Sequence, residues 1–158
     1  MITYLTGDAT EPQGEGVKII AHICNSIGAW GSGFVMALSK KWITPEAEYR
    51  HWAKEGNNLT KFELGNVQFV WVEKEIFVAN MIAQEGVGFK NGIPPIRYEA
   101  LRECLRTLNI ECTDDNKHTI TVHMPRIGSG LAGGDWAVIE AIINDTITVD
   151  VFVYDLPK

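Results

Sequence analysis

The chain has 158 residues and a formal net charge of −6 at pH 7, with 22% charged and 46% hydrophobic residues. This length and balance fit one globular domain with its own core, so we expect a single domain over residues 1–158. The negative charge and the lack of a basic run argue against binding to long DNA or RNA, which requires a basic face. No apolar run approaches the roughly 20 residues that cross a bilayer, and the opening MITYLTGDAT lacks the basic and apolar parts of a signal peptide. We therefore expect a cytoplasmic protein that binds neither long nucleic acid nor membranes.

The spacing of cysteines and histidines predicts neither a disulfide nor a metal site. The cysteines are odd in number and form no CxxC pair, which favours free thiols in a reducing compartment; they are Cys24, Cys104 and Cys112. Three of the four histidines share no ligand spacing, namely His51, His118 and His123. We accordingly expect no metal and no cofactor.

Short apolar runs rich in β-branched residues alternate with helical patterns along the chain. In chain order, we predict strands at 2–7 and 18–24, helices at 33–42 and 45–56, strands at 66–73 and 75–83, a helix at 95–110, a strand at 119–124, a helix at 135–146 and a strand at 148–155. The two middle strands form a hairpin that turns at Glu73 to Glu75. Several strands are apolar almost throughout, as expected when both faces of a sheet are covered. The sequence therefore predicts an α/β fold with a largely parallel, six-stranded sheet between helices.

Local signals support the predicted helices. Pro45 and Gly56 mark the start and the end of the second helix. The third carries an apolar stripe from Tyr98 to Leu108. Asp135 suits an N-cap better than acid catalysis. Four tryptophans fit amphipathic patterns and are expected in the core: Trp42, Trp52, Trp71 and Trp136.

Two glycine-rich segments each join a predicted strand to a predicted helix. The first, CNSIGAWGSGF (24–34), has three glycines around Trp30, and the second, GSGLAGG, occupies 128–134. Glycine lets a backbone approach a ligand closely, and ligands of α/β sheets bind outside the carboxyl ends of the strands. Each following helix adds free N–H groups, so the pair predicts a cleft for a diphosphate. Neither segment matches a P-loop or a GxGxxG motif, and a tight strand-to-helix turn explains either one taken alone.

Three motifs in order along the chain resemble the macrodomain family. They are GDAT (7–10), AHICNSIGAWGSGF (21–34) and MPRIGSGLAGGDW (124–136), and the likeness continues to the closing VFVYDL. The family binds ADP-ribose on a three-layer α/β/α sandwich with a mixed sheet, so the resemblance implies that fold and ligand. HICNSIGAWGSG is most similar to the branch with ADP-ribose-1''-phosphate phosphatases and terminal ADP-ribose glycohydrolases.

The resemblance also implies roles for residues at matching positions. Asp8, beside Ala9, would accept a hydrogen bond from the adenine amino group, and Tyr154 and Leu156 would lie near the adenine. Asn25 would lie near the distal ribose. The first loop would wrap the distal ribose and one phosphate through Gly28, Ala29, Trp30, Gly31, Ser32, Gly33 and Phe34. The second loop would wrap the diphosphate through Gly128, Ser129, Gly130 and Leu131.

His22 and Asn25 are the candidate catalytic residues, which would orient a water or the leaving group at the distal ribose. The alternatives are a core histidine bonded to a backbone carbonyl and a turn asparagine. Asp8 is alternatively a turn or cap residue. Arg126 would contact either a phosphate or a carboxylate partner. Trp30 would either shield the distal site from water or pack the loop.

The sequence departs from the related branch at two positions. Glycohydrolases that cleave ADP-ribose from glutamate use a lysine after the fourth strand and an aspartate in the second loop, where this chain has Ala83–Gln84 and Ala132. Neither alanine nor glutamine can form a Schiff base. Lys90 follows at the wrong spacing. The lysine chemistry of that branch is therefore not expected.

The favoured function is an enzyme, a monomer that binds ADP-ribose or ADP-ribose-1''-phosphate and hydrolyses the latter or a related derivative. Its short chain without a tail favours an enzyme over a reader. Two alternatives stay open. One is a non-catalytic reader of ADP-ribose, and the other is a hydrolase acting on ADP-ribosylated protein or nucleic acid.

Overall fold

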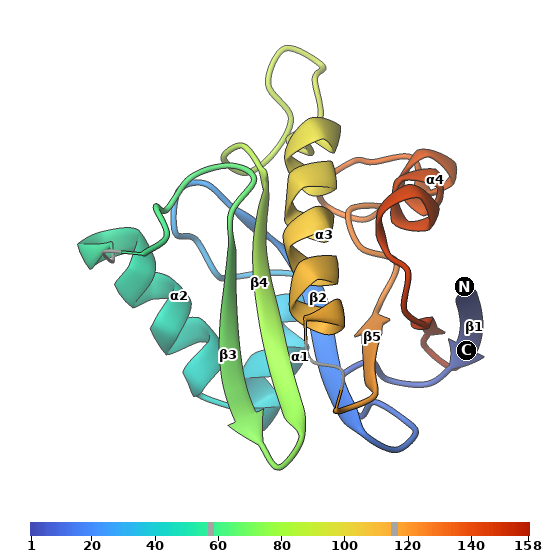
Figure 1. Cartoon of the computed structure of the whole chain (residues 1–158). Helices are drawn as coiled ribbons and strands as arrows, with labels where there is room; N and C mark the ends of the chain where they lie inside the picture. Colours follow the sequence, from blue (N-terminus) through green and yellow to red (C-terminus); the bar gives the residue numbers. More distant parts are fainter. Residues whose placement is uncertain (57–58, 115–116) are drawn as a thin grey trace.

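A six-stranded sheet forms the centre of the molecule (Figure 1). The structure is a computed structural model that describes residues 1–56, 59–114 and 117–158. The strands are β1 (Ile2–Thr6), β2 (Val17–Asn25), β3 (Val67–Glu73), β4 (Ile76–Gln84), β5 (Ile120–Met124) and β6 (Val151–Asp155), in the spatial order β1-β6-β5-β2-β4-β3. Only the pair of β3 and β4 is antiparallel. The predicted six-stranded, largely parallel sheet and its hairpin are confirmed.

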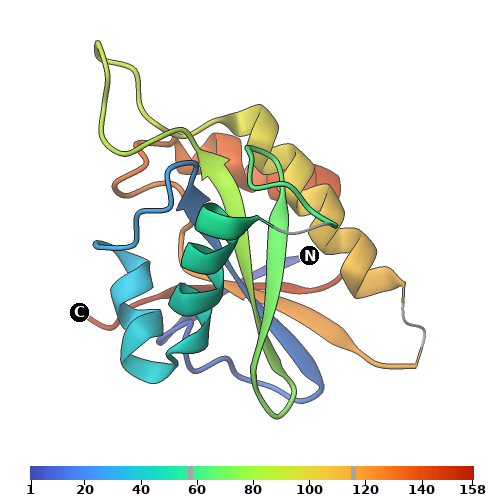
Figure 2. The same cartoon turned by 90° about the vertical axis from the view of Figure 1, so that its left-hand side faces the viewer.

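Helices cover both faces of this sheet (Figure 2). They are α1 (Phe34–Lys41), α2 (Thr44–Glu55), α3 (Tyr98–Thr113) and α4 (Trp136–Thr146). On one face, Leu38 of α1 and Trp52 of α2 pack against Ile20 of β2. On the other face, apolar side chains of α3 and α4, such as Leu105 and Ile143, pack on the opposite side of the same strands. The result is the three-layer α/β/α architecture that the sequence predicts.

The starts of α3 and β6 differ from the prediction because of contacts with distant parts of the chain. The third helix begins at Tyr98 rather than at residue 95, because the chain stays extended alongside β4: Ile96 bridges to Gln84, and Arg97 N–H donates to Ala83 O at 2.8 Å. The last strand begins at Val151 rather than at 148. The N–H of Thr148 instead donates to Asn109 Oδ1 at 2.9 Å.

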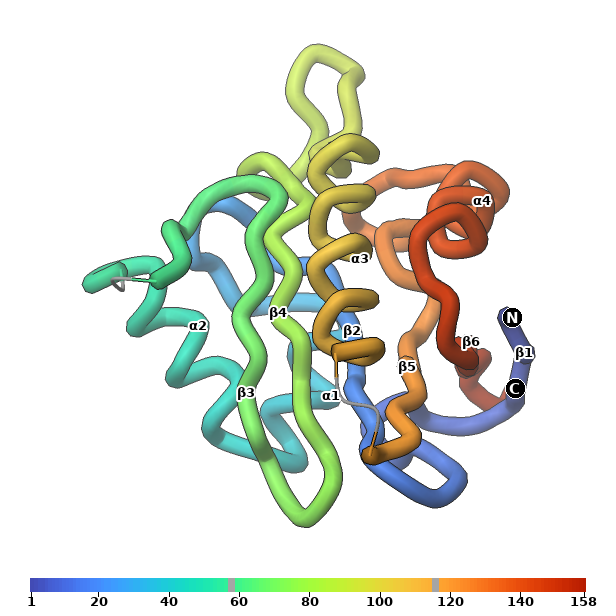
Figure 3. Tube along the Cα trace, in the orientation of Figure 1, coloured from blue at the N-terminus to red at the C-terminus, as the bar shows by residue number. Residues whose placement is uncertain are grey.

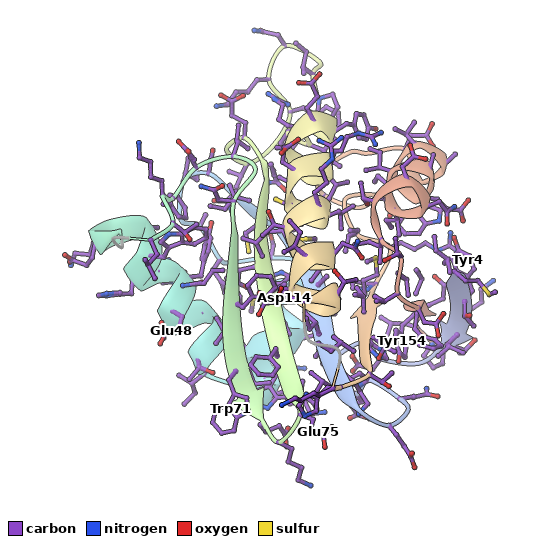
Figure 4. All side chains as sticks on the ribbon, viewed as in Figure 1. Tyr4, Glu48, Trp71, Glu75, Asp114 and Tyr154 are labelled. Atoms are coloured by element: carbon purple, nitrogen blue, oxygen red, sulfur yellow. The ribbon has the colours of Figure 1, made fainter. Side chains whose placement is uncertain are left out.

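The expectation that four tryptophans lie in the core is wrong for Trp71. Its side chain is 59% exposed on β3, the edge strand, and its Nε1–H donates to Lys74 O (Figure 4). An edge strand leaves part of its apolar surface without a neighbour. Trp52 is fully buried, whereas Trp42 and Trp136 are partly buried against the core.

The three cysteines are buried as free thiols, as the sequence predicts. Both termini lie on the β1–β6 side of the sheet (Figure 3). Within the described ranges, none of the helices combines the length and apolar character needed to cross a membrane.

The topology gathers the glycine segments at one edge. Because β2, β4 and β5 are parallel, the loops that follow them emerge at the same end of the sheet, at the top of Figure 1. These are the first glycine loop (residues 26–33), a finger over residues 85–97 and the second glycine loop (residues 125–135).

Candidate functional site

A cleft with two adjoining cavities lies between the glycine loops. The smaller cavity, of about 280 Å³, lies between Ser32–Val35 and residues 125–132, with His22 at its wall. The larger, of about 460 Å³, runs along the first loop to Val87 and Gly88 of the finger. Both cavities are lined by Gln84 and Leu131, so they form one continuous cleft. Larger open depressions of about 590 and 650 Å³ flank α3, but neither is bounded by a glycine loop.

Three carbonyl groups of the first glycine loop accept hydrogen bonds from side chains of the protein. Arg50 of α2 donates to Gly28 O and to Trp30 O, both at 3.2 Å. Asn25 Nδ2 donates to Ala29 O at 2.8 Å. By contrast, four successive backbone N–H groups have no acceptor among the described residues. They belong to Trp30, Gly31, Ser32 and Gly33. The loop therefore offers four successive backbone donors beside the cleft.

The second glycine loop repeats this arrangement. The carbonyl oxygens of Gly128 and Gly130 accept from Gly134 N–H at 2.7 Å and Gly133 N–H at 3.0 Å. Ala132 O accepts a hydrogen bond at 3.2 Å from Ile96 N–H of the finger. Within the described ranges, the N–H groups of three residues have no protein acceptor, namely Gly130, Leu131 and Ala132. Both walls of the cleft thus expose backbone donors, which is the arrangement that binds anions without basic side chains.

Gly33 and Gly128 hold these loops in conformations that other residues rarely adopt. Gly33 has φ 83° as the N-cap of α1, and Gly128 has φ 74°. A methyl group on Gly128 would also lie 2.6 Å from Ile96 Cδ1. The two loops meet across the cleft, because a methyl group on Gly33 would lie 3.5 Å from Leu131 Cδ1.

The two helices that follow the loops differ at their N-termini. No side chain caps α1, and the N–H groups of Phe34 and Val35 have no acceptor among the described residues, whereas Met36 N–H donates to Gly33 O at 3.1 Å. At α4, Asp135 Oδ1 accepts from Ala137 N–H at 2.9 Å, which confirms Asp135 as an N-cap. The expectation that both helices add free N–H groups is therefore correct for α1, whereas the N-terminus of α4 is capped.

His22 lies in the core beneath the cleft and is only 1% exposed. Its Nε2 lies 2.5 Å from Asn80 Oδ1, and since the Asn80 amide nitrogen donates to Pro45 O and Gln68 Oε1, His22 Nε2 is the donor. Burial lowers the pKa of His22 from 6.5 to about 4, although the bond to Asn80 acts in the opposite direction. The ring is therefore neutral at pH 7. Its bonded partner is a side-chain amide rather than a backbone carbonyl.

Asn25 organises the first loop from its own side chain. Its Oδ1 accepts from Ile27 N–H at 3.1 Å, from Ala29 N–H at 3.0 Å and from the Tyr49 hydroxyl at 3.1 Å. The residue lines the larger cavity. Trp30 packs the loop, since it is buried against His22 and Tyr49.

The end of β4 has no amine at the cleft. Ala83 is buried, and Gln84 lines both cavities while its Nε2 donates to Gly86 O at 2.9 Å. Ala132 of the second loop is also buried. Cys24 lines the larger cavity, and burial raises the pKa of its thiol well above the ordinary value, so it is neutral.

The residues predicted for the adenine lie on the β1–β6 side, outside the lining of the two cavities. Asp8 Oδ1 accepts from Thr10 N–H at 2.8 Å and from the Thr10 hydroxyl at 2.7 Å, which shows the turn role directly. Ala9 and Tyr154 are buried, and Leu156 is exposed. The Tyr154 hydroxyl accepts from Gln13 N–H in the loop that carries Asp8.

Arg126 has a carboxylate partner. Its Nε and Nη2 donate to the two oxygens of Asp155 at 2.7 and 3.0 Å, and the guanidinium lies over the rings of Tyr4 and Trp136. This pair holds the pKa of Asp155 below its usual value. Arg126 also lines the smaller cavity.

Two parts of this site are not predicted from the sequence. Tyr49 and Arg50, which hold the first loop, lie on α2 and carry no local signal of that role. The finger could have been found from Asn91-Gly92, since both residues have positive φ, as a type I′ turn requires. The finger packs against the second loop, because a methyl group on Gly133 would lie 2.5 Å from Phe89 Cζ.

Curated relatives and solved structures of similar length resemble this chain. No family model matches the chain. ADP-ribose 1''-phosphate phosphatase of Lodderomyces elongisporus is 25% identical, over 98% of this chain and 99% of that protein. A protein of unknown function from Bacteroides thetaiotaomicron is 51% identical, with a TM-score of 0.91 over 98% of both chains. A macrodomain protein from Streptomyces coelicolor is 46% identical, with a TM-score of 0.83 over 98% of this chain and 99% of that one.

Proposed function

The chain belongs to the macrodomain family, and on this premise we propose that it binds ADP-ribose across its two glycine loops and hydrolyses a bond at the distal ribose. The first candidate substrate is ADP-ribose-1''-phosphate, the substrate named for the curated relative from Lodderomyces elongisporus. The enzyme acts on a small nucleotide rather than on long nucleic acid, in keeping with the net charge of −6.

The observation that carries this proposal is the shared orientation of the two loops. In each loop several carbonyl oxygens accept hydrogen bonds from protein donors, while successive N–H groups at the cleft have no acceptor among the described residues. A diphosphate between them accepts hydrogen bonds from both walls, and each bond to a charged oxygen is stronger than one between neutral groups. The uncapped N-terminus of α1 adds favourable potential at the same place.

The cavities suggest where the rest of the ligand lies. The adenine lies toward Asp8 and Tyr154, and the diphosphate in the smaller cavity between the loops. The distal ribose and its substituent occupy the larger cavity, beside Asn25 and Gln84. Binding of the rest of the nucleotide thereby holds the terminal bond in position in this cavity.

Hydrolysis then depends on positioning more than on a strong base. His22 is neutral at pH 7, and its Nε2–H donates to Asn80 Oδ1. It therefore orients neighbouring groups and does not carry a second ring proton to donate. The Gln84 amide oxygen has no donor within the described part of the chain, and Asn25 Nδ2 keeps one N–H. These two amides are suited to hold a water molecule against the terminal group.

A reader without catalysis is the second candidate function. It is favoured by the larger cavity, where Cys24 is the one titratable side chain among the described lining residues and its thiol is neutral. Calorimetry with ADP-ribose and AMP tests the binding site first. AMP lacks the second phosphate and the distal ribose, so we expect weaker binding of AMP. Equal affinities would contradict the two-loop site.

Phosphate release from ADP-ribose-1''-phosphate then separates the two functions. Turnover by the wild-type protein, lost in a variant that no longer binds ADP-ribose, identifies an enzyme. Binding of ADP-ribose without turnover identifies a reader.

A further inference from the structure

Helix α2 holds the first glycine loop from the side opposite the cleft. The Arg50 guanidinium donates from Nη1 to Gly28 O and from Nη2 to Trp30 O. Its Nε donates to Glu46 Oε2 at 2.9 Å, which fixes the plane of the group. One planar side chain therefore donates hydrogen bonds to two carbonyl oxygens of the loop, a geometry that arginine offers and lysine does not.

A second connection from the same helix reaches Trp30. The Trp30 indole N–H donates to Ser39 Oγ at 2.8 Å, and the Ser39 hydroxyl donates to Glu46 Oε1 at 3.2 Å. Glu46 thus joins both connections, since it also receives Arg50. Trp30 is held through its backbone carbonyl and through its ring.

The hydrogen bond from Arg50 to Trp30 O determines where the N–H of Gly31 points. In a trans peptide the C=O and the following N–H point in opposite directions. Because Trp30 O is turned outward to Arg50, the N–H of Gly31 is turned toward the larger cavity, which Gly31 lines. Glycine offers little resistance to a rotation of this peptide, so the orientation depends on the outer contacts.

We propose that Arg50 is a positioning residue for the ligand: it keeps the Trp30–Gly31 peptide with its N–H toward the larger cavity, where the distal ribose and its substituent lie. This inference rests on the proposed binding of ADP-ribose. Arg50 itself stays on the outer side of the loop, and half of its side chain is exposed. Its pair with Glu46, at an i,i+4 spacing on a helix surface, contributes little to stability. Its loss therefore affects the loop more than the fold.

The test compares Arg50→Ala and Arg50→Lys with a matched control. Arg106→Ala removes an exposed helix arginine that also pairs with a glutamate on its own helix, Glu103, but lies on α3 away from the cleft. We expect Arg50→Ala to weaken ADP-ribose binding about tenfold, the size expected for losing two hydrogen bonds that orient the loop. Binding of AMP should change less than about twofold, because AMP does not reach Gly31. Arg50→Lys should restore only part of the affinity.

A ligand-free measurement on the same variants keeps the inference separate from the proposed function. We expect ¹⁵N relaxation to show order parameters at Trp30 to Gly33 falling from about 0.85 toward 0.6 in Arg50→Ala, with those of Gly130 to Ala132 unchanged. Unchanged order at the first loop would overturn the inference, as would equal losses of ADP-ribose and AMP affinity together with a lower melting temperature. If the wild-type protein fails to bind ADP-ribose, the proposed function fails, and the relaxation result alone decides the role of Arg50.

Discussion

His22 Nε2 lies 2.5 Å from Asn80 Oδ1 on the neighbouring strand, with both side chains buried beneath the cleft. The bond requires a proton on Nε2, which the neutral ring supplies. A second buried histidine, His123, is paired in a similar way with the Tyr154 hydroxyl at 2.8 Å. Burial lowers the pKa of both rings from 6.5 to about 4.

We therefore predict that the protein loses stability as the pH falls from about 6.5 to 4.5. In this window the unfolded chain binds protons at both histidines while the folded chain does not, so acid favours unfolding. The loss should be roughly 2 kcal/mol for each histidine, from the lowered pKa values. Urea unfolding at pH 7.0, 5.5 and 4.5 measures it.

The variant His22→Gln is the control for this assignment. Glutamine keeps an N–H for Asn80 but does not titrate, so the pH dependence between 6.5 and 4.5 should shrink by about half. A variant that loses stability with acid as steeply as the wild-type protein would show that His22 does not cause the effect.

Asp8→Ala should weaken ADP-ribose binding by roughly 1–3 kcal/mol, the usual loss for a hydrogen bond to a charged group. Asp8 Oδ1 is already shared by two bonds from Thr10, so Oδ2 is the oxygen left for the adenine amino group. Calorimetry on the variant measures the loss.

The variant Thr10→Val separates the adenine contact from the turn. It removes the hydroxyl bond to Asp8 and leaves the carboxylate in place, so ADP-ribose should bind nearly as well as to the wild-type protein. If Thr10→Val weakens binding as much as Asp8→Ala, the carboxylate serves the turn and not the adenine.

Much of this fold follows from local patterns in the sequence. The strand runs, Pro45 at the start of α2 and Asp135 at the start of α4 act within a few residues of themselves, and the structure has them where the sequence predicts. Trp71 could not be assigned from its pattern, because the strand order decides which strand lies at an edge. The late start of α3 also depends on pairing, since Ile96 bridges to β4.

The candidate site also has some features that local sequence patterns predict and others that depend on distant contacts. Glycine spacing predicted the two loops, and parallel strands brought them to one edge. The orientation of the Trp30–Gly31 peptide depends on a contact across 20 residues, that of Arg50 with Trp30, which no local motif encodes. The capped N-terminus of α4 shows the converse case. Asp135 was predicted as a cap, and the cap occupies the helix end that an anion would otherwise use.

Gly130→Glu should abolish ADP-ribose binding while the protein keeps a melting temperature near that of the wild type. Gly130 has an ordinary backbone conformation, and a methyl group built on it meets no atom within 4 Å, so the fold has room for a side chain. That room is the smaller cavity, which Gly130 lines. A carboxylate there occupies the space of the diphosphate and repels it, and we expect a loss of at least about 100-fold, or roughly 3 kcal/mol.

Two further variants separate charge, bulk and backbone strain. Gly130→Gln has nearly the same shape without the charge, so it should bind ADP-ribose more tightly than Gly130→Glu. Gly33→Glu should also lose binding, but with a lower melting temperature, because Gly33 has φ 83°, a backbone conformation that a glutamate adopts only with strain. Thermal melting and calorimetry on the same preparations provide both readouts. Retained affinity in a folded Gly130→Glu protein would show that the second loop is only a turn between β5 and α4.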